Sequence, residues 1–295
     1  MGVETQSARG AAAATTVEAL LRAGVRLLGA TSASPRLDAE LLLGWTLGRN
    51  RAALFARRDA VVEPAAAARY LDAIHARQAG QPVAQLVGRR EFWSLDLAVT
   101  ADVLTPRPET ELAVERALAH LPPGGRVLDL GTGSGAIALA IATERPDAQV
   151  LATDSSPAAL TVARHNAGAL GLGNVVFAAG DWYAAAGGAE FDLIVANPPY
   201  LAESELATAD RELAFEPRTA LVAGPDGLDA IRRIVTGAPA HLAAGGWMVL
   251  EHGATQGETT RTLCAAAGLI AVTTARDLAG LPRITEGRHP ASTRS

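Results

Sequence analysis

The chain contains no lysine, and all 26 basic residues among its 295 are arginine. This absence excludes enzymes that form a Schiff base on a lysine, and phosphate-binding loops that depend on one. The single cysteine, Cys264, cannot form an internal disulfide, and with six scattered histidines it offers no spaced metal-binding cluster. No segment approaches the ~20 apolar residues of a membrane span, and the first residues lack the form of a signal peptide. We therefore expect a reduced, cytoplasmic protein without a metal or a membrane partner.

Charge is distributed unevenly along a chain of otherwise ordinary globular composition, long enough for about two domains. Residues 1–90 carry 12 arginines against 7 acidic residues, whereas residues 91–295 carry 14 against 24. The basic part permits a nucleic-acid surface, but its arginines are spaced like solvated helix faces and turns. We expect no direct nucleic-acid partner.

Hydrophobic patterns divide the chain. In residues 17–82 apolar residues recur every three or four positions, as in Leu37, Leu41, Leu42 and Trp45. This spacing predicts a small helical bundle. From 83 to 104 the period shortens towards two, which predicts a β-hairpin linker that includes the segment VAQLV. In residues 105–288 strand and helix patterns alternate, so we expect an α/β domain whose parallel sheet ends in a hairpin. Residues 1–16 and 289–295 are expected to form a flexible leader and tail.

A glycine-rich turn follows the strand pattern of residues 127–130. It reads Gly131-Thr132-Gly133-Ser134-Gly135, and a helix begins near Ala136. Glycines at the carboxyl edge of a parallel sheet let a cofactor approach the backbone, and the helix presents free N–H groups. The pattern suits the amino-acid end of S-adenosylmethionine, but also a dinucleotide, and a tight turn without a ligand is the third interpretation.

Two further segments follow strands at this edge. Asp154 comes 23 residues after Gly131, where a carboxylate accepts hydrogen bonds from ribose hydroxyls, although it is alternatively an N-cap for the helix beginning at Pro157. Asp181-Trp182 places an acceptor and an aromatic face beside the expected adenine, and a tryptophan in the core is the alternative.

The tetrapeptide Asn197-Pro198-Pro199-Tyr200 follows the next apolar strand pattern, 191–196. Two prolines after a buried strand hold the backbone rigid and free its carbonyls from pairing. The Asn197 side-chain oxygen and the Pro198 carbonyl are suited to accept both hydrogens of a planar NH₂ group, and Tyr200 to enclose it. Such acceptors favour the nitrogen as it gains positive charge during methyl transfer. A simple turn is the alternative for the tetrapeptide alone, but its pairing with the glycine turn favours catalysis and disfavours a dehydrogenase.

Together these motifs resemble the protein-(glutamine-N5) methyltransferases that modify class I peptide chain release factors. The resemblance extends from about Val17 to Arg288. It is carried by the following stretches: 81–82 with 90–93, 104–111, 129–135, 181–182, 197–200, 216–217 with 226–228, and 250–253.

The resemblance implies a Rossmann-like, seven-stranded class I methyltransferase domain after a helical domain that helps to hold the release factor. The substrate would be the glutamine of a Gly-Gly-Gln loop. The residues implied to contact S-adenosylmethionine are Gly131, Thr132, Gly133, Ser134, Gly135, Asp154, Asp181, Trp182 and Asn197. Those implied to hold the glutamine amide are Asn197, Pro198, Pro199 and Tyr200, of which Asn197, Pro198 and Tyr200 are the catalytic candidates.

Competing functions stay open at this point. An adenine-N6 methyltransferase of DNA or RNA uses the same order of motifs, but the acidic charge of residues 91–295 disfavours a nucleic-acid face. A methyltransferase for a ribosomal-protein glutamine is a closer alternative, although residues 106–111 favour the release-factor branch. An inactive binding scaffold is the third alternative, and the intact Asn197 and Asp154 disfavour it. His252 follows a strand, where packing or helix capping is favoured over a role as a base. The segment 201–225 is either a closing loop or a surface crossing. We expect a monomer.

Overall fold

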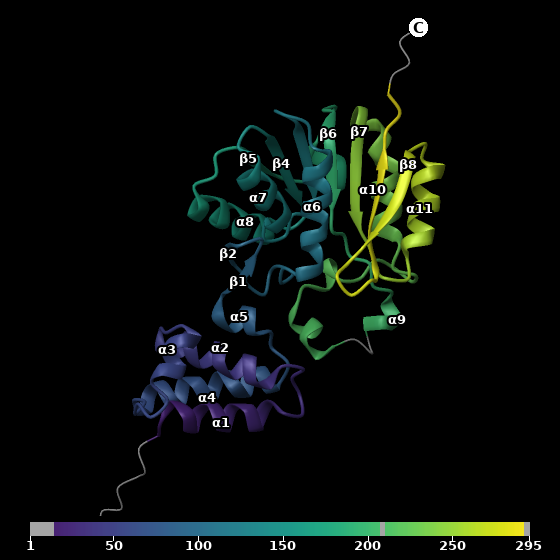
Figure 1. Cartoon of the computed structure of the whole chain (residues 1–295). Helices are drawn as coiled ribbons and strands as arrows, with labels where there is room; N and C mark the ends of the chain where they lie inside the picture. Colours follow the sequence, from purple (N-terminus) through teal and green to yellow (C-terminus); the bar gives the residue numbers. More distant parts are fainter. Residues whose placement is uncertain (1–14, 207–209, 292–295) are drawn as a thin grey trace, which may run out of the picture. The chain divides into compact units, whose positions relative to one another are not determined.

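The computed structural model describes residues 15–206 and 210–291. The expected leader, except Thr15 and Thr16, and the last four residues of the expected tail lie outside these ranges. The backbone divides into two compact units, residues 1–87 and residues 88–295 (Figure 1). No helix in the described ranges combines the length and the hydropathy that crossing a membrane requires.

The first unit is helical, as the apolar spacing predicts. Its helices are α1 (Val17–Leu28), α2 (Pro35–Leu47), α3 (Arg51–Ala56), α4 (Pro64–Gln78) and α5 (Val83–Val87). The Thr16 hydroxyl caps α1 by accepting a hydrogen bond from the Ala19 N–H at 3.2 Å, and the Thr15 carbonyl accepts one from the Val62 N–H at 2.9 Å. Thr15 and Thr16 therefore belong to this unit rather than to a flexible leader.

Helix α2 buries only part of the face that its apolar spacing indicates. Leu42 is buried as expected, but Leu37, Leu41 and Trp45 are 39%, 38% and 44% exposed, whereas Asp38 is 5% exposed. An ion pair with α4 accounts for the buried acid, because Arg77 Nε donates to Asp38 Oδ2 at 2.7 Å and both side chains are only 7% exposed. A buried carboxylate needs such partners, so it fixes the rotation of α2.

The segment VAQLV, expected to be a strand, is helix α5. The carbonyl of Pro82 accepts hydrogen bonds from the N–H groups of Gln85 and Leu86, both at 3.1 Å, which starts a helical turn. The strand prediction was wrong because five residues are too few to distinguish the two periods.

The hairpin itself consists of β1 (Arg89–Phe92) and β2 (Leu95–Ala98), paired antiparallel. Phe92 and Leu97 are buried in the core of the second unit, and the Asn166 side chain bonds to both the N–H and the carbonyl of Ala98, at 2.7 and 3.1 Å. The hairpin is thus shorter than the expected linker 83–104 and packs as a part of the second unit.

The second unit contains a seven-stranded sheet in the order β5-β4-β3-β6-β7-β9-β8, which confirms the expected fold class. The strands β3 to β7 are parallel, and β9 runs antiparallel to β7 and to β8, as the final strand patterns predict. The bounds are β3 (Arg126–Leu130), β4 (Gln149–Asp154), β5 (Val175–Ala179), β6 (Phe191–Ala196), β7 (Leu242–Glu251), β8 (Ile270–Arg276) and β9 (Pro282–Arg288).

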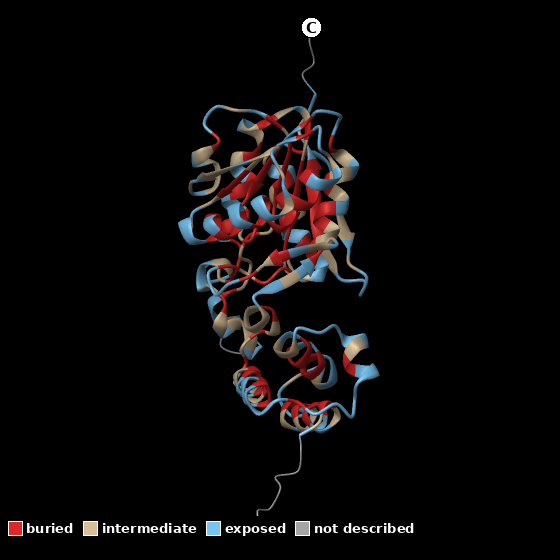
Figure 2. Cartoon of the chain, turned by 90° about the vertical axis from the view of Figure 1, so that its left-hand side faces the viewer, coloured by how far each residue is buried: buried red, intermediate tan, exposed pale blue. Residues whose placement is uncertain are grey.

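Helices cover both faces of this sheet. They are α6 (Glu111–His120), preceded by the 3₁₀ turn η1 (Pro108–Thr110), then α7 (Ala136–Glu144), α8 (Pro157–Leu170), α10 (Asp229–Gly237) and α11 (Gly257–Ala266). The short helix α9 (Glu203–Leu206), which buries none of its residues, belongs to the segment after β6. Neighbouring strand residues alternate between two cores, since Val127 packs with α6 and α7, and Leu128 with α10 and α11. Figure 2 shows these buried residues concentrated in the sheet and on the helix faces against it.

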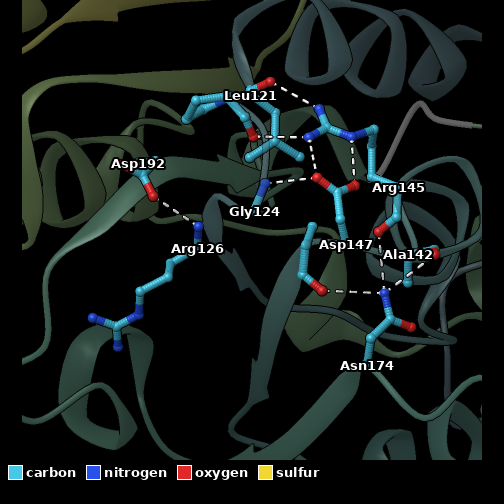
Figure 3. Close-up of polar contacts among 10 residues, drawn as sticks. Leu121, Gly124, Arg126, Ala142, Arg145, Asp147, Asn174 and Asp192 are labelled. Atoms are coloured by element: carbon cyan, nitrogen blue, oxygen red, sulfur yellow. Dashed lines mark hydrogen bonds and ion pairs between the residues drawn. The ribbon is translucent and has the colours of Figure 1, made fainter.

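Polar contacts fasten the loops at the amino ends of the parallel strands (Figure 3). The Arg145 guanidinium donates to the Leu121 carbonyl at 2.8 Å and pairs with Asp147, whose carboxylate also accepts from the Gly124 N–H at 2.6 Å. The Asn174 side-chain amide donates to three carbonyls, of Ala142, Arg145 and Ala148, each at 3.2 Å. The loops at this edge of the sheet are therefore held by structural hydrogen bonds and an ion pair. The carboxyl ends of the parallel strands lie at the opposite edge.

We expect Asp38→Ala to lower the free energy of unfolding by ~3–5 kcal/mol, because it removes the carboxylate that balances the buried Arg77 charge. Urea denaturation followed by circular dichroism measures the change. Arg22→Ala is the control, since it breaks an exposed pair with Glu18 at 3.3 Å and is expected to cost under ~1 kcal/mol. Equal losses in the two variants would contradict the role given to Asp38.

Candidate active site

A cavity opens at the carboxyl ends of β3, β4 and β6. Its empty volume is about 1070 Å³ when the part open to solvent is included. The expected site residues that line it are Gly131, Thr132, Gly133, Ser134, Asp154, Asp181, Trp182, Asn197, Pro198 and Pro199. Gly135 and Tyr200 are not among the lining residues.

The glycine turn forms one wall of the cavity. Gly131, Gly133 and Gly135 have φ angles of 73°, 56° and 87°, a conformation that favours glycine. A Cβ on Gly131 would lie 3.6 Å from the Trp182 ring, which narrows the space that a ligand needs. A Cβ on Gly135 would instead meet Leu139 at 3.0 Å, so Gly135 serves the start of α7 rather than the cavity.

Asp154 ends β4 with its carboxylate held by backbone donors. Its Oδ2 accepts from the Gly133 N–H at 2.9 Å, and its Oδ1 accepts from the Ser156 N–H at 2.8 Å. The N-cap of α8 is Ser156, whose hydroxyl accepts from the Ala159 N–H at 3.2 Å. Asp154 therefore does not cap α8, and each of its oxygens keeps a lone pair for a ligand.

Asp181 and Trp182 follow β5. Trp182 is partly buried and adopts a φ of 51°, which aims its ring at the cavity wall beside Gly131. Asp181 is exposed and pairs with Arg233 Nη2 at 2.5 Å, so its carboxylate already has a cationic partner. Of the two, Trp182 is the one held against the glycine turn.

Asp129, in β3, is a cavity residue that the site prediction omitted. It is 1% exposed and accepts a hydrogen bond from the Thr132 hydroxyl at 2.6 Å. Burial raises the pKa of its carboxyl to about 7, against the opposing effect of that hydrogen bond. The signal available in the sequence was an acid two residues before the first glycine, inside an otherwise apolar strand.

Asn197 directly follows β6 and contributes a side-chain amide to the cavity wall. Its Nδ2 donates to the Thr110 hydroxyl oxygen at 3.1 Å. Its Oδ1 is buried and has no hydrogen-bond partner among the described residues. A buried carbonyl oxygen without a donor is costly, so this atom is prepared to accept a hydrogen bond from a ligand.

Tyr200, the last residue of the tetrapeptide, packs its side chain against the core formed with α10 and α11. Its backbone carbonyl accepts a hydrogen bond from Gln256 Nε2 at 2.9 Å. Burial, with the nearby Glu251 carboxylate, raises the pKa of Tyr200 to about 12. The phenol is therefore neutral near pH 7 and does not act as a base.

Glu251, the last residue of β7, is a second residue that the site prediction missed. It is 1% exposed, and burial raises the pKa of its carboxyl to about 7 although Thr110 and Asn197 favour its ionised form. No period or spacing in the sequence distinguishes this acid from a surface residue after a strand.

His252 packs rather than reacts. Its Nδ1 bonds with the Gly253 carbonyl and its Nε2 with the Thr285 hydroxyl, each at 2.9 Å. A carbonyl only accepts, so Nδ1 carries the proton and Nε2 accepts from Thr285. Burial lowers the pKa of His252, which keeps the ring neutral.

The segment 201–225 contributes to the cavity through Pro217, Thr219 and Ala220. It is fastened by Glu216, which accepts from Arg107 Nη2 at 2.6 Å and from the Thr105 N–H at 3.2 Å. This part of the segment is therefore a wall of the cavity rather than a simple surface crossing, and residues 207–209 lie outside the described residues.

Comparisons with known proteins agree with this geometry. Residues 18–88 match the family described as PrmC N-terminal domain, and residues 110–224 match the methyltransferase small domain. The chain is 53% identical over 266 residues to the release factor glutamine methyltransferase of Xylella fastidiosa strain Temecula1, covering 90% of this chain and 97% of that protein. It is 44% identical over 260 residues to that of Escherichia coli K12, covering 88% and 94%.

A solved methyltransferase from Pyrococcus furiosus has the same fold. Its TM-score is 0.50 at 18% identity, over 66% of this chain and 89% of that one. The identity to the curated relatives extends through both units and includes nearly their whole length. The chain therefore belongs to the family of release factor glutamine methyltransferases.

Proposed function

We propose that this enzyme transfers the methyl group of S-adenosylmethionine to the side-chain amide nitrogen, N5, of the glutamine in the Gly-Gly-Gln motif of class I peptide chain release factors. The observation that carries the proposal is the buried Oδ1 of Asn197 at the cavity wall, an acceptor without a donor among the described residues. Membership of the family supports the class of substrate.

The cavity residues fit S-adenosylmethionine, which when bound supplies an electrophilic methyl group on a sulfonium. The Asp154 carboxylate, oriented by the N–H groups of Gly133 and Ser156, would accept from the ribose hydroxyls. The glycine turn would hold the amino-acid end, and Trp182 would pack against the adenosine. Thr132, Ser134 and Asp181 also line the cavity, and for that reason we propose them as further contacts of the cofactor.

The chemistry that the chain must provide is activation of a poor nucleophile. An amide nitrogen is planar and its lone pair is delocalised into the carbonyl. If Asn197 Oδ1 and the Pro198 carbonyl accept its two hydrogens, the nitrogen is fixed with one face towards the methyl group. The same oxygens stabilise the positive charge that develops on nitrogen, an effect worth about 10²-fold or more.

No strong base is required before attack, because the nitrogen becomes acidic only as the new bond forms. This agrees with the environment of the candidate bases. Tyr200 is neutral because burial raises its pKa, and both ring nitrogens of His252 are used in packing. Pro199 then serves to shape the pocket around the flat amide, and Tyr200 supports the tetrapeptide from the core.

We further propose that the helical unit, residues 17–82, helps to recruit the release factor. Exposed apolar side chains gather on it, at Leu37, Leu41 and Trp45 of α2 and at Phe55 of α3. The guanidinium carbons of Arg36 and Arg58 lie 5.6 and 5.0 Å from the centre of the Phe55 ring, so basic and apolar side chains share this region. Large exposed apolar residues rimmed by charge are typical of protein-binding surfaces.

The enzyme is proposed to act in the cytoplasm as a monomer, without a metal and without direct contact to nucleic acid. The acidic charge of residues 91–295 supports the last point, because a duplex binder needs a cationic face. The same charge disfavours an adenine methyltransferase, and the family match disfavours a ribosomal-protein substrate and an inactive scaffold.

We expect Asn197→Ala to lower the turnover number by at least ~10²-fold while S-adenosylmethionine still binds, because the variant loses the acceptor but keeps the cofactor wall. Mass spectrometry of the Gly-Gly-Gln peptide from treated release factor measures the added methyl group. Asn174→Ala is the matched control, since it removes an asparagine that fastens the opposite edge of the sheet. Near-normal turnover in Asn197→Ala would refute the mechanism.

Asp154→Ala is expected to have the opposite signature. The loss of a charged acceptor should weaken cofactor binding by ~10- to 100-fold, while turnover at saturating cofactor changes little. Isothermal titration calorimetry and initial rates separate the two quantities. If cofactor affinity were unaltered, the ribose contact assigned to Asp154 would be wrong.

The double variant Leu41→Ser/Trp45→Ser is expected to raise the KM for release factor on the order of ten-fold, with cofactor affinity unaltered, because both residues are exposed on α2. Leu278→Ser, at an exposed apolar residue of the second unit, is the control. Steady-state kinetics with intact release factor provide the test. An unchanged KM would limit the helical unit to a structural role.

A further inference from the structure

Glu251 lies next to Asn197 but outside the cavity. Strands β6 and β7 are neighbours, and Ala196 pairs with Leu250, so the residues that follow each of them, Asn197 and Glu251, are adjacent. Asn197 and Thr110 line the cavity, whereas Glu251 does not. The carboxylate therefore stands behind the two side chains that face the ligand.

A carboxyl group at this place costs stability. It is 1% exposed, and its Oε2 has no hydrogen-bond partner among the described residues. Of the charged groups that face it, Arg283 of β9 favours its ionised form, whereas Glu109 of η1 opposes it. Tyr200, also close, is neutral. A neutral residue of the same shape would avoid this desolvation, so stability does not account for the carboxylate.

The hydrogen bonds around Thr110 have a defined direction if Glu251 is ionised. The Thr110 oxygen accepts a hydrogen from Asn197 Nδ2 at 3.1 Å, so its own hydroxyl hydrogen is directed to another acceptor. The neighbouring Glu251 carboxylate is that acceptor in our proposal, because Thr110 lowers its pKa and a carboxylate only accepts. Asn197 likewise favours the ionised form of Glu251. Both interactions use the NH₂ end of Asn197, which leaves Oδ1 free.

We propose that Glu251 is a positioning residue for methyl transfer: acting with Thr110, it holds the NH₂ end of Asn197 and thereby presents Oδ1 to the substrate amide. The inference rests on the proposed function, because it requires that Oδ1 accept a hydrogen from the glutamine. It adds that the asparagine alone is insufficient. The two ends of its amide have nearly the same size, and only the acceptors behind it distinguish them.

The direct test is Glu251→Gln in the full-length enzyme. The new amide can donate to Thr110, which frees the Thr110 hydroxyl to donate to Asn197 Oδ1 and turns the wrong end of Asn197 to the substrate. We expect kcat to fall by ~10- to 100-fold, with the KM for release factor and the affinity for S-adenosylmethionine within about two-fold of the parent. A role in folding alone would instead lower thermal stability and cofactor affinity together.

Thr110 provides a test that does not depend on the folding of the Glu251 variant. Thr110→Val removes the bridging oxygen and should lower kcat to a similar extent. Thr110→Ser keeps the hydroxyl and should recover most of the turnover that valine loses. Because the residues act as one unit, the double variant Glu251→Gln/Thr110→Val should have a kcat within about two-fold of the slower single variant.

Glu286→Gln is the matched control, since Glu286 is also buried, at 4% exposure, but pairs with Arg116 away from the cavity. It should retain the parent kcat. Parent-like kcat in Glu251→Gln, or equal turnover in the valine and serine variants, would overturn the inference alone. Absence of glutamine methylation by the parent enzyme would overturn the proposed function instead.

Discussion

The side-chain amide of Asn197 is held from one end only. Its nitrogen donates to Thr110, with Glu251 beside it, while its oxygen is buried without a donor among the described residues. An amide left free to turn would present either end, and a nitrogen facing the substrate would repel the hydrogens that the reaction must bind. In the proposed mechanism, the glycine turn and Asp154 hold the cofactor, and this oxygen orients the substrate amide beside it.

The parallel sheet explains how these groups meet. Asp154 ends β4, Asn197 directly follows β6, and Glu251 ends β7. These three strands run in the same direction, with β4 and β6 on either side of β3 and β7 next to β6. Carboxyl ends of parallel strands share one edge, so Asn197 and Glu251, which are distant in the sequence, become neighbours. The opposite edge is fastened by contacts such as Arg145 with Asp147, which leaves the loops at the ligand edge to form the cavity.

Strong local patterns made most of the fold and much of the cavity lining predictable. Alternating strands and helices, the glycine turn and the acid after the next strand have periods or spacings with a physical cause. The failures have causes too: five residues of VAQLV fit either period, and α2 leaves Leu37, Leu41 and Trp45 exposed while it buries Asp38 in an ion pair with Arg77. Glu251 and Thr110 were missed because their role depends on a contact between distant segments.

A structure of the enzyme with S-adenosylhomocysteine and a Gly-Gly-Gln peptide, at a resolution that separates amide nitrogen from oxygen, tests the central claim most directly. The account predicts the glutamine amide nitrogen about 3 Å from Asn197 Oδ1, with Asn197 Nδ2 still bonded to Thr110. An Asn197 amide turned with Nδ2 towards the glutamine, or a glutamine bound away from this oxygen, would contradict it.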